Sequence, residues 1–168
     1  MITKGPNVQR PYDEYYSGDP AFVQPPISPG KDADDEERTA YAVAAKAYVE
    51  SVERARETGD WSHLRVEGSA PPTRFHVKPM PGEAFREICA RIENREPAVL
   101  LAPWAFRAAI VKMENAGEHE IKWENHPRFG RIATNATTNY LDAIDMSIVT
   151  EIGLVLAARG TQGLSPKS

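Results

Sequence analysis

The hydrophobic pattern is densest between Pro103 and Asn115, where it predicts a buried helix. Apolar side chains at helical spacing form two adjoining faces, with Trp104, Ala108 and Val111 on one and Phe106, Ile110 and Met113 on the other. A helix that is apolar over most of its circumference packs inside a core. Pro103 suits the first helical position and Gly117 can end the last turn. We therefore expect this segment to be the central helix.

Residues 34–58 carry the clearest signals for the start and the end of a helix. Acidic side chains crowd the first turn from Asp34 to Glu37, and Gly59 follows as a stop. A narrow stripe at spacing three and four consists of Tyr41, Ala44, Ala45, Tyr48, Val52 and Ala55. The stripe suits packing on a single neighbour, which could be the body of the protein or a partner helix.

Alternating patterns predict short strands in two regions. In 61–80, Leu64 and Val66 alternate with polar residues, as do Phe75 and Val77 after a Gly/Pro-containing loop, so we expect a strand pair. Pro79 and Pro81 end the second strand and favour an edge or short strand. Residues 118–125 alternate again and predict a strand, followed by a loop with a short strand at 131–133.

Two more helices are expected, at 83–94 and 139–159. The first has Phe85, Ile88, Cys89 and Ile92 on one face. The second has an apolar stripe containing Gly153, a residue that costs roughly 1 kcal/mol relative to alanine inside a helix. We interpret Gly153 as the mark of a close approach between helices. Residues 97–102 fit either a short helix or a buried extended run.

The first 31 residues read as an extended arm. Six of the fourteen prolines fall within the first thirty residues, and aromatic residues are spaced among them. Prolines stop helices and remove donors from a sheet. Such a segment fits a disordered tail, or an arm that lays its aromatic side chains on its own body or on a neighbour; purely solvated tails contain few aromatic residues.

Length and composition favour one α+β domain with an appendage. The chain has 168 residues, 41% hydrophobic and 26% charged, and the part after the arm is long enough to bury one core. We predict a mainly helical single domain with a small antiparallel sheet. The expected division is an extended Pro-rich arm at 1–33, a body at 34–160 with its core at 61–160, and a C-terminal tail at 161–168.

The net charge of −4 is concentrated near the start of the chain. Residues 1–38 carry four basic and eight acidic side chains, and the rest carries sixteen of each. A neutral body with an acidic arm has no electrostatic reason to bind nucleic acid or an anionic membrane. A single cysteine excludes an intrachain disulfide and fits a reducing cytosol. We see no signal peptide and no apolar run long enough to span a bilayer.

The best polar cluster comprises Glu118, His119, Glu120 and His126, with His63 or His76 brought in by folding. Imidazole and carboxylate groups bind zinc and exchange protons. On a strand, however, His119 and Glu120 point to opposite faces, and no zinc signature is present. We expect no catalytic residue, no metal and no cofactor. A small metal-dependent enzyme using His119, Glu120 and His126 is the alternative.

Three stretches resemble small structural proteins of tailed phages and prophages. They are Arg74–Glu83 leading into a helix, Val111–Gly117, and Glu151–Leu156 late in the chain. Tail-assembly chaperones and small head or tail components are both similar at this level. The resemblance implies protein partners and supplies no catalytic residue to carry over.

We predict a non-enzymatic protein that works through contacts with other subunits. It would be a phage head, neck or tail component or an assembly factor, located in the virion or the host cytoplasm. The expected partner-binding side chains are Tyr12, Tyr15, Tyr16, Phe22, Tyr41 and Tyr48. Removal of residues 1–30 is expected to leave folding intact and to abolish assembly. The alternative within this class is a soluble tail-assembly chaperone that binds its client through the 34–58 helix.

Overall fold

A computed structural model describes residues 11–80, 82–115, 123–128, 130–133 and 146–161. The chain divides into two units. The described part of the first is Ser17–Pro72, and the second combines residues 11–16 with the described residues from Thr73 onward. The predicted α+β class is confirmed, because the described residues form helices and two small antiparallel sheets.

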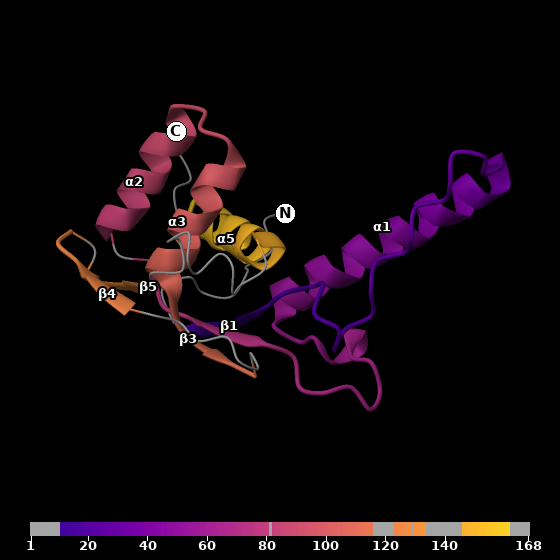
Figure 1. The fold of residues 1–168 in the computed structure, drawn as a ribbon, viewed down its shortest axis with the longest axis horizontal. Helices are drawn as coiled ribbons and strands as arrows, with labels where there is room; N and C mark the ends of the chain where they lie inside the picture. Colours follow the sequence, from indigo (N-terminus) through magenta and orange to yellow (C-terminus); the bar gives the residue numbers. More distant parts are fainter. Residues whose placement is uncertain (1–10, 81, 116–122, 129, 134–145, 162–168) are drawn as a thin grey trace. The chain divides into compact units, whose positions relative to one another are not determined.

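The first unit is built on α1 (Asp35–Thr58) (Figure 1). Residues next to each end of the helix supply its capping hydrogen bonds. The Asp34 carboxylate accepts the Glu37 N–H at 2.8 Å, and the Glu37 carboxylate accepts the Asp34 N–H at 3.2 Å. At the other end Gly59 takes a left-handed φ of 74°, and its N–H donates to the Ala55 carbonyl. The predicted helix is confirmed, since both end signals act within a few residues of the helix.

The core of the first unit is thin. Phe22 and Trp61 are buried with ring centroids 5.1 Å apart, and α1 contributes only Val52 and Ala55 as buried residues. Ala21 and Leu64 are the other buried apolar residues of this unit. Most of α1 therefore has no buried side chain.

The predicted strand at Leu64 and Val66 is wrong. Ser62–Leu64 form a 3₁₀ turn, and Arg65 makes only an isolated bridge to Phe22. The Asp60 carboxylate accepts the Ser62 N–H at 2.9 Å, which turns the chain directly after the stop of α1. The alternation of two apolar residues did not reveal this competing local hydrogen bond.

The second unit contains a three-stranded antiparallel sheet in the order β1 (Tyr12–Tyr15), β2 (Arg74–Val77), β3 (Ile110–Glu114). Strand β2 is short, as predicted, but it lies in the centre. Pro79 and Pro81 follow its last residue and so remove no donor from its ladder. Phe75 and Val77 are buried on the inner face, while Arg74 and His76 alternate with them on the outer face.

The predicted central helix is wrong at both ends. Helix α3 runs over Ala98–Ala109 with Pro103 in its interior, and Ile110–Glu114 form strand β3. The Lys78 N–H donates to the Ala109 carbonyl at 2.9 Å. Pairing with the β2 segment therefore begins at the residue where the helix ends. A bulge between His76 and Val77 leaves Val111 unpaired, which keeps Ile110 on the inner face and Lys112 on the outer face.

Helices α2 (Gly82–Glu93), α3 and α5 (Met146–Thr161) pack around the inner face of this sheet (Figure 1). The main core consists of Phe75, Val77, Ile88, Ala105, Phe106, Ala109, Ile110, Val149, Ile152, Leu156 and Ala157. Gly153 lies where α5 meets α3, and a Cβ built on it would stand 2.1 Å from the Ala102 carbonyl oxygen. The predicted close approach at Gly153 is confirmed. Residues 139–145 of the predicted closing helix lie outside the described residues.

Strands β4 (Trp123–His126) and β5 (Gly130–Ala133) form a separate antiparallel pair. They confirm the predicted strands for the residues that the structure describes, while 118–122 lie outside them. Ile132 of β5 is buried with Ala84 of α2 and Ala108 of α3. The pair is thereby attached to the helices of the second unit.

A buried ion pair joins the first strand to the last helix of the second unit. Glu14 is 1% exposed, and its Oε2 accepts a hydrogen bond from Arg159 Nη1 at 2.6 Å. The Arg159 guanidinium also lies 4.8 Å from the centre of the Tyr12 ring. Because 12–15 is a strand and Glu14 neutralises a buried arginine, we no longer expect removal of residues 1–30 to leave folding intact.

Candidate functional site

The exposed face of α1 is the leading candidate for a functional surface. Val43 is 66% exposed and Val49 is 51% exposed on this helix. The first unit carries five of the nine large exposed hydrophobic side chains of the described residues, namely Val23, Ile27, Val43, Val49 and Val66. Single exposed valines are ordinary, but the thin core of this unit leaves most of the helix without a packed neighbour in its own unit.

The second unit uses its predicted partner-binding tyrosines internally. Tyr12 packs against the main core, and burial raises the pKa of its hydroxyl. The Tyr16 hydroxyl lies 3.0 Å from Ser147 Oγ, and Tyr16 also packs against that core. Tyr15 is half-buried at the end of β1. The structure thus places these three residues on their own unit, as one form of the arm prediction allowed.

Phe22, Tyr41 and Tyr48 lie in the first unit. Phe22 is 1% exposed in its core, so it has no surface to offer to a partner. The Tyr48 hydroxyl donates to the Ser17 carbonyl at 3.3 Å, and both tyrosines of α1 are half-buried. The predicted stripe therefore faces its own unit, except at Ala44, which is exposed. The face that remains exposed carries Ala40, Val43 and Ala47. Their spacing of three and four is also visible in the sequence, but the prediction used only the stripe that contains the tyrosines.

The outer face of the three-stranded sheet carries charged side chains around His76. Its Nδ1 lies 2.7 Å from Asp13 Oδ1, and its Nε2 lies 3.3 Å from Glu114 Oε2 without the geometry of a hydrogen bond. Arg74 Nη1 is 3.8 Å from a carboxylate oxygen of each acid. Lys112 also pairs with Glu114 and lowers the pKa of that carboxyl. The carboxylates flank opposite ring nitrogens and do not converge on one point, so the cluster joins three strands and is no metal site.

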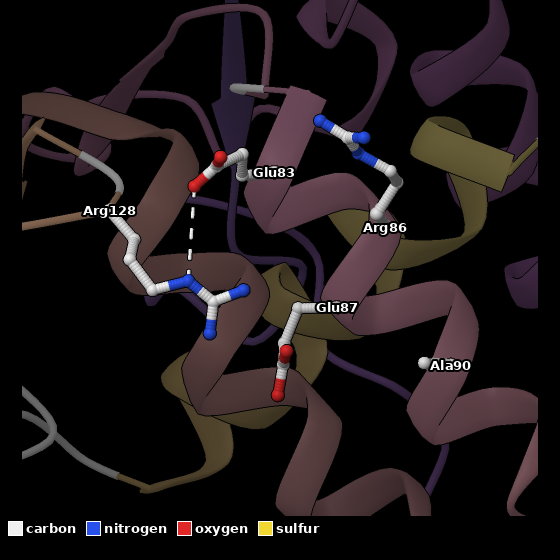
Figure 2. Close-up of a pocket in the computed structure, with 5 residues that line it drawn as sticks. All are labelled: Glu83, Arg86, Glu87, Ala90 and Arg128. Atoms are coloured by element: carbon white, nitrogen blue, oxygen red, sulfur yellow. Dashed lines mark ion pairs between the residues drawn. The ribbon is translucent and has the colours of Figure 1, made fainter.

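A hollow of about 270 Å³ lies beside α2 (Figure 2). Its lining residues are Glu83, Arg86, Glu87, Ala90 and Arg128. Figure 2 shows Arg128 reaching toward Glu83, and the ion pair joins Nε and Oε2 at 3.9 Å. Both side chains are about half exposed or more. The lining offers two carboxylates and two guanidinium groups whose charges balance, as on an ordinary solvated surface.

Of the three residues predicted for a metal-dependent enzyme, the structure describes only His126. His119 and Glu120 lie outside the described residues. His126 is half-buried, and its ring centre lies 6.2 Å from that of Trp104 in an edge contact. Within the described ranges, no three His, Cys, Asp or Glu side chains are placed to hold one metal ion. Metal analysis of the purified protein remains the test of this alternative.

Cys89 is half-buried on α2, and burial raises the pKa of its thiol. A raised pKa lowers the fraction of the reactive thiolate at neutral pH.

Comparison with known proteins gives no relative. No family model, no curated protein and no solved structure matches the chain. None of the described helices has the length and hydrophobicity that crossing a bilayer requires.

Proposed function

We propose that this protein acts through protein–protein contacts and that its partner covers the exposed face of α1. The observation that supports the proposal is the 66% exposure of Val43 on a 24-residue helix that its own unit buries only at Val52 and Ala55. Most of the stability of a helix in a protein comes from packing one of its faces. Covering a valine stabilises a complex by roughly 1.5 kcal/mol or more. A partner that covers α1 would therefore bury apolar surface that the folded chain leaves exposed, and this burial would stabilise the complex.

Within this class of function, we propose a subunit or assembly factor of a phage-like particle, in the virion or the host cytoplasm. The support is the resemblance of Arg74–Glu83, Val111–Gly117 and Glu151–Leu156 to small phage structural proteins. A structural subunit stays in the finished particle, whereas a tail-assembly chaperone leaves it. Mass spectrometry of purified particles separates the two roles.

Photo-crosslinking at the exposed valine tests the docking surface. Benzoylphenylalanine replaces Val43 in the full chain, produced in the cells that make the protein natively. A matched control carries the same probe at Ile92, which is 43% exposed on a helix of the second unit. We expect a discrete protein adduct from position 43 and none from position 92, because only the first surface is proposed to be covered.

Each outcome of this experiment is informative. An adduct at position 43, whether with a second copy or with a different protein, supports the proposed function. Absence of any adduct at position 43, from a variant whose circular dichroism equals that of the wild type, contradicts it. Equal yields at both positions also contradict it, because the probe would then report only random encounters.

A further inference from the structure

We propose that the partner of α1 is α1 of a second copy of this chain, packed antiparallel across a two-fold axis. This inference rests on the proposed function and names the occupant of the exposed face. The physical basis is a seam of exposed residues along α1 whose charges complement the same seam when it is reversed.

The seam consists of Glu36, Ala40, Val43, Ala47, Glu50 and Arg54. These positions are separated by four, three, four, three and four residues, which is the heptad spacing that keeps one stripe of a helix facing a partner helix. All six residues are exposed. At 100° per residue the centre of the seam lies about 130° around the helix from the centre of the stripe that contains Tyr48, Val52 and Ala55. The stripe can therefore pack on its own unit while the seam packs on a different molecule.

Reversal of the seam produces matching contacts. With the two-fold axis at residue 45, Val43 faces the partner's Ala47, and Glu36 faces the partner's Arg54. Neither Glu36 nor Arg54 makes an ion pair with another described residue. The symmetry repeats each contact, so the pair has an apolar centre and an acid–base contact at both ends. The alanines beside Val43 allow the two helix axes to come as close as about 8 Å.

The parallel arrangement is disfavoured by charge. It would place Glu36 against the partner's Glu36 and Arg54 against the partner's Arg54, both of which repel. It would also align the two helix dipoles, whereas the antiparallel arrangement sets the acidic first turn of one helix beside the basic end of the other. Charge thus favours the antiparallel direction over the parallel one.

Lys46 introduces one repulsion into the antiparallel pair, because it flanks the two-fold axis. Its side chain is 78% exposed, and its Nζ lies 3.9 Å from Glu50 Oε1 of the same helix. A long side chain can keep its ammonium group in water while its methylenes cover the seam. The repulsion is therefore screened, and we expect a dimer of moderate affinity.

Sedimentation equilibrium of the full-length chain measures this dimer. We expect a monomer–dimer equilibrium with a dissociation constant below about 1 mM. Val43→Glu should weaken the dimer roughly tenfold or more by placing a carboxylate at the apolar centre of each copy. Val49→Glu is the matched control. It makes the same change at an exposed valine of the same helix but outside the seam, and it should leave the dimer unchanged.

A charge exchange tests the register. Glu36→Arg and Arg54→Glu should each weaken the dimer by roughly fivefold, because each places two like-charge contacts in the pair. The double variant restores opposite charges across the axis and should recover the affinity of the wild type. Sedimentation as a monomer up to about 1 mM, equal effects of the two valine variants, or no recovery in the double variant would overturn the inference. A Val43 crosslink to a different protein would overturn it as well, while leaving the proposed function supported.

Discussion

Replacing Gly153 by alanine should reverse the usual effect of this substitution. Inside an ordinary helix the change stabilises by roughly 1 kcal/mol, because alanine has the higher helix propensity. Here the new Cβ would stand 2.1 Å from the oxygen, 2.5 Å from the carbonyl carbon and 2.7 Å from the Cα of Ala102. These are backbone atoms of α3, so no side-chain rotation relieves the contact. The helices must separate by roughly 1 Å to restore a normal distance.

The expected magnitude follows from two opposing effects. Overpacking a core costs up to about 3 kcal/mol, and we take this upper value because backbone must move. Subtracting about 1 kcal/mol of gained helix propensity leaves a destabilisation of about 2 kcal/mol. For a chain of this size that loss lowers the melting temperature by about 4–8 °C. Thermal unfolding followed by circular dichroism, supported by urea unfolding, measures the change.

Two companion variants make this test specific. Gly82→Ala changes the first residue of α2, where no atom lies within 4 Å of the new Cβ, and it should be neutral or stabilising. Adding Ala102→Gly to Gly153→Ala should not restore stability, since the contacted atoms belong to the backbone. A Gly153→Ala protein as stable as the wild type would refute the close packing of α3 against α5.

Three further predictions concern buried and charged side chains. Glu14→Ala should destabilise by about 3 kcal/mol in urea unfolding, because the Arg159 charge would stay buried without its partner; an unchanged midpoint would contradict a buried pair. Lys112 helps hold the pKa of Glu114 below its usual value of 4.5, so this carboxylate stabilises the fold above that pH and the contribution is lost as pH falls through the lowered pKa. Glu114→Gln should therefore flatten the acid side of the stability–pH curve, and an unaltered curve would argue against the effect. Cys89 should react with iodoacetamide more slowly than a free cysteine at pH 8, as mass spectrometry can follow, because burial raises the pKa of its thiol; reaction at the free rate would contradict this.

The site was predictable only in part, because exposure depends on what the rest of the chain covers. The tyrosines of α1 were expected to meet a partner, yet Tyr48 hydrogen-bonds within its own unit. The opposite seam around Val43 has an equally regular spacing in the sequence. Spacing alone could not tell which of two stripes on one helix faces inward. The buried pair of Glu14 and Arg159 joins residues 145 positions apart, which no local pattern reveals.

Features with local causes could be predicted from the residues alone. Helix α1 begins and ends where Asp34, Glu37 and Gly59 supply the missing hydrogen bonds. Gly153 predicted a close contact between helices, because a glycine inside a helix costs stability unless the packing leaves no room for a side chain. The alternation at Arg74–Val77 was enough to predict a strand. Each of these signals acts within a turn or two of the residue that carries it.

The hydrogen-bond partners of several segments depend on contacts between residues far apart in the chain. Ile110–Glu114 has a helical pattern, but β2 has open hydrogen-bonding groups on that side, so the chain leaves α3 and becomes a strand. Residues Tyr12–Tyr15 lie in a proline-rich segment, but they pair with the other edge of β2 and form strand β1. The physical reason is the same in both cases. An unpaired buried peptide group costs more free energy than a local preference for helix or coil can supply.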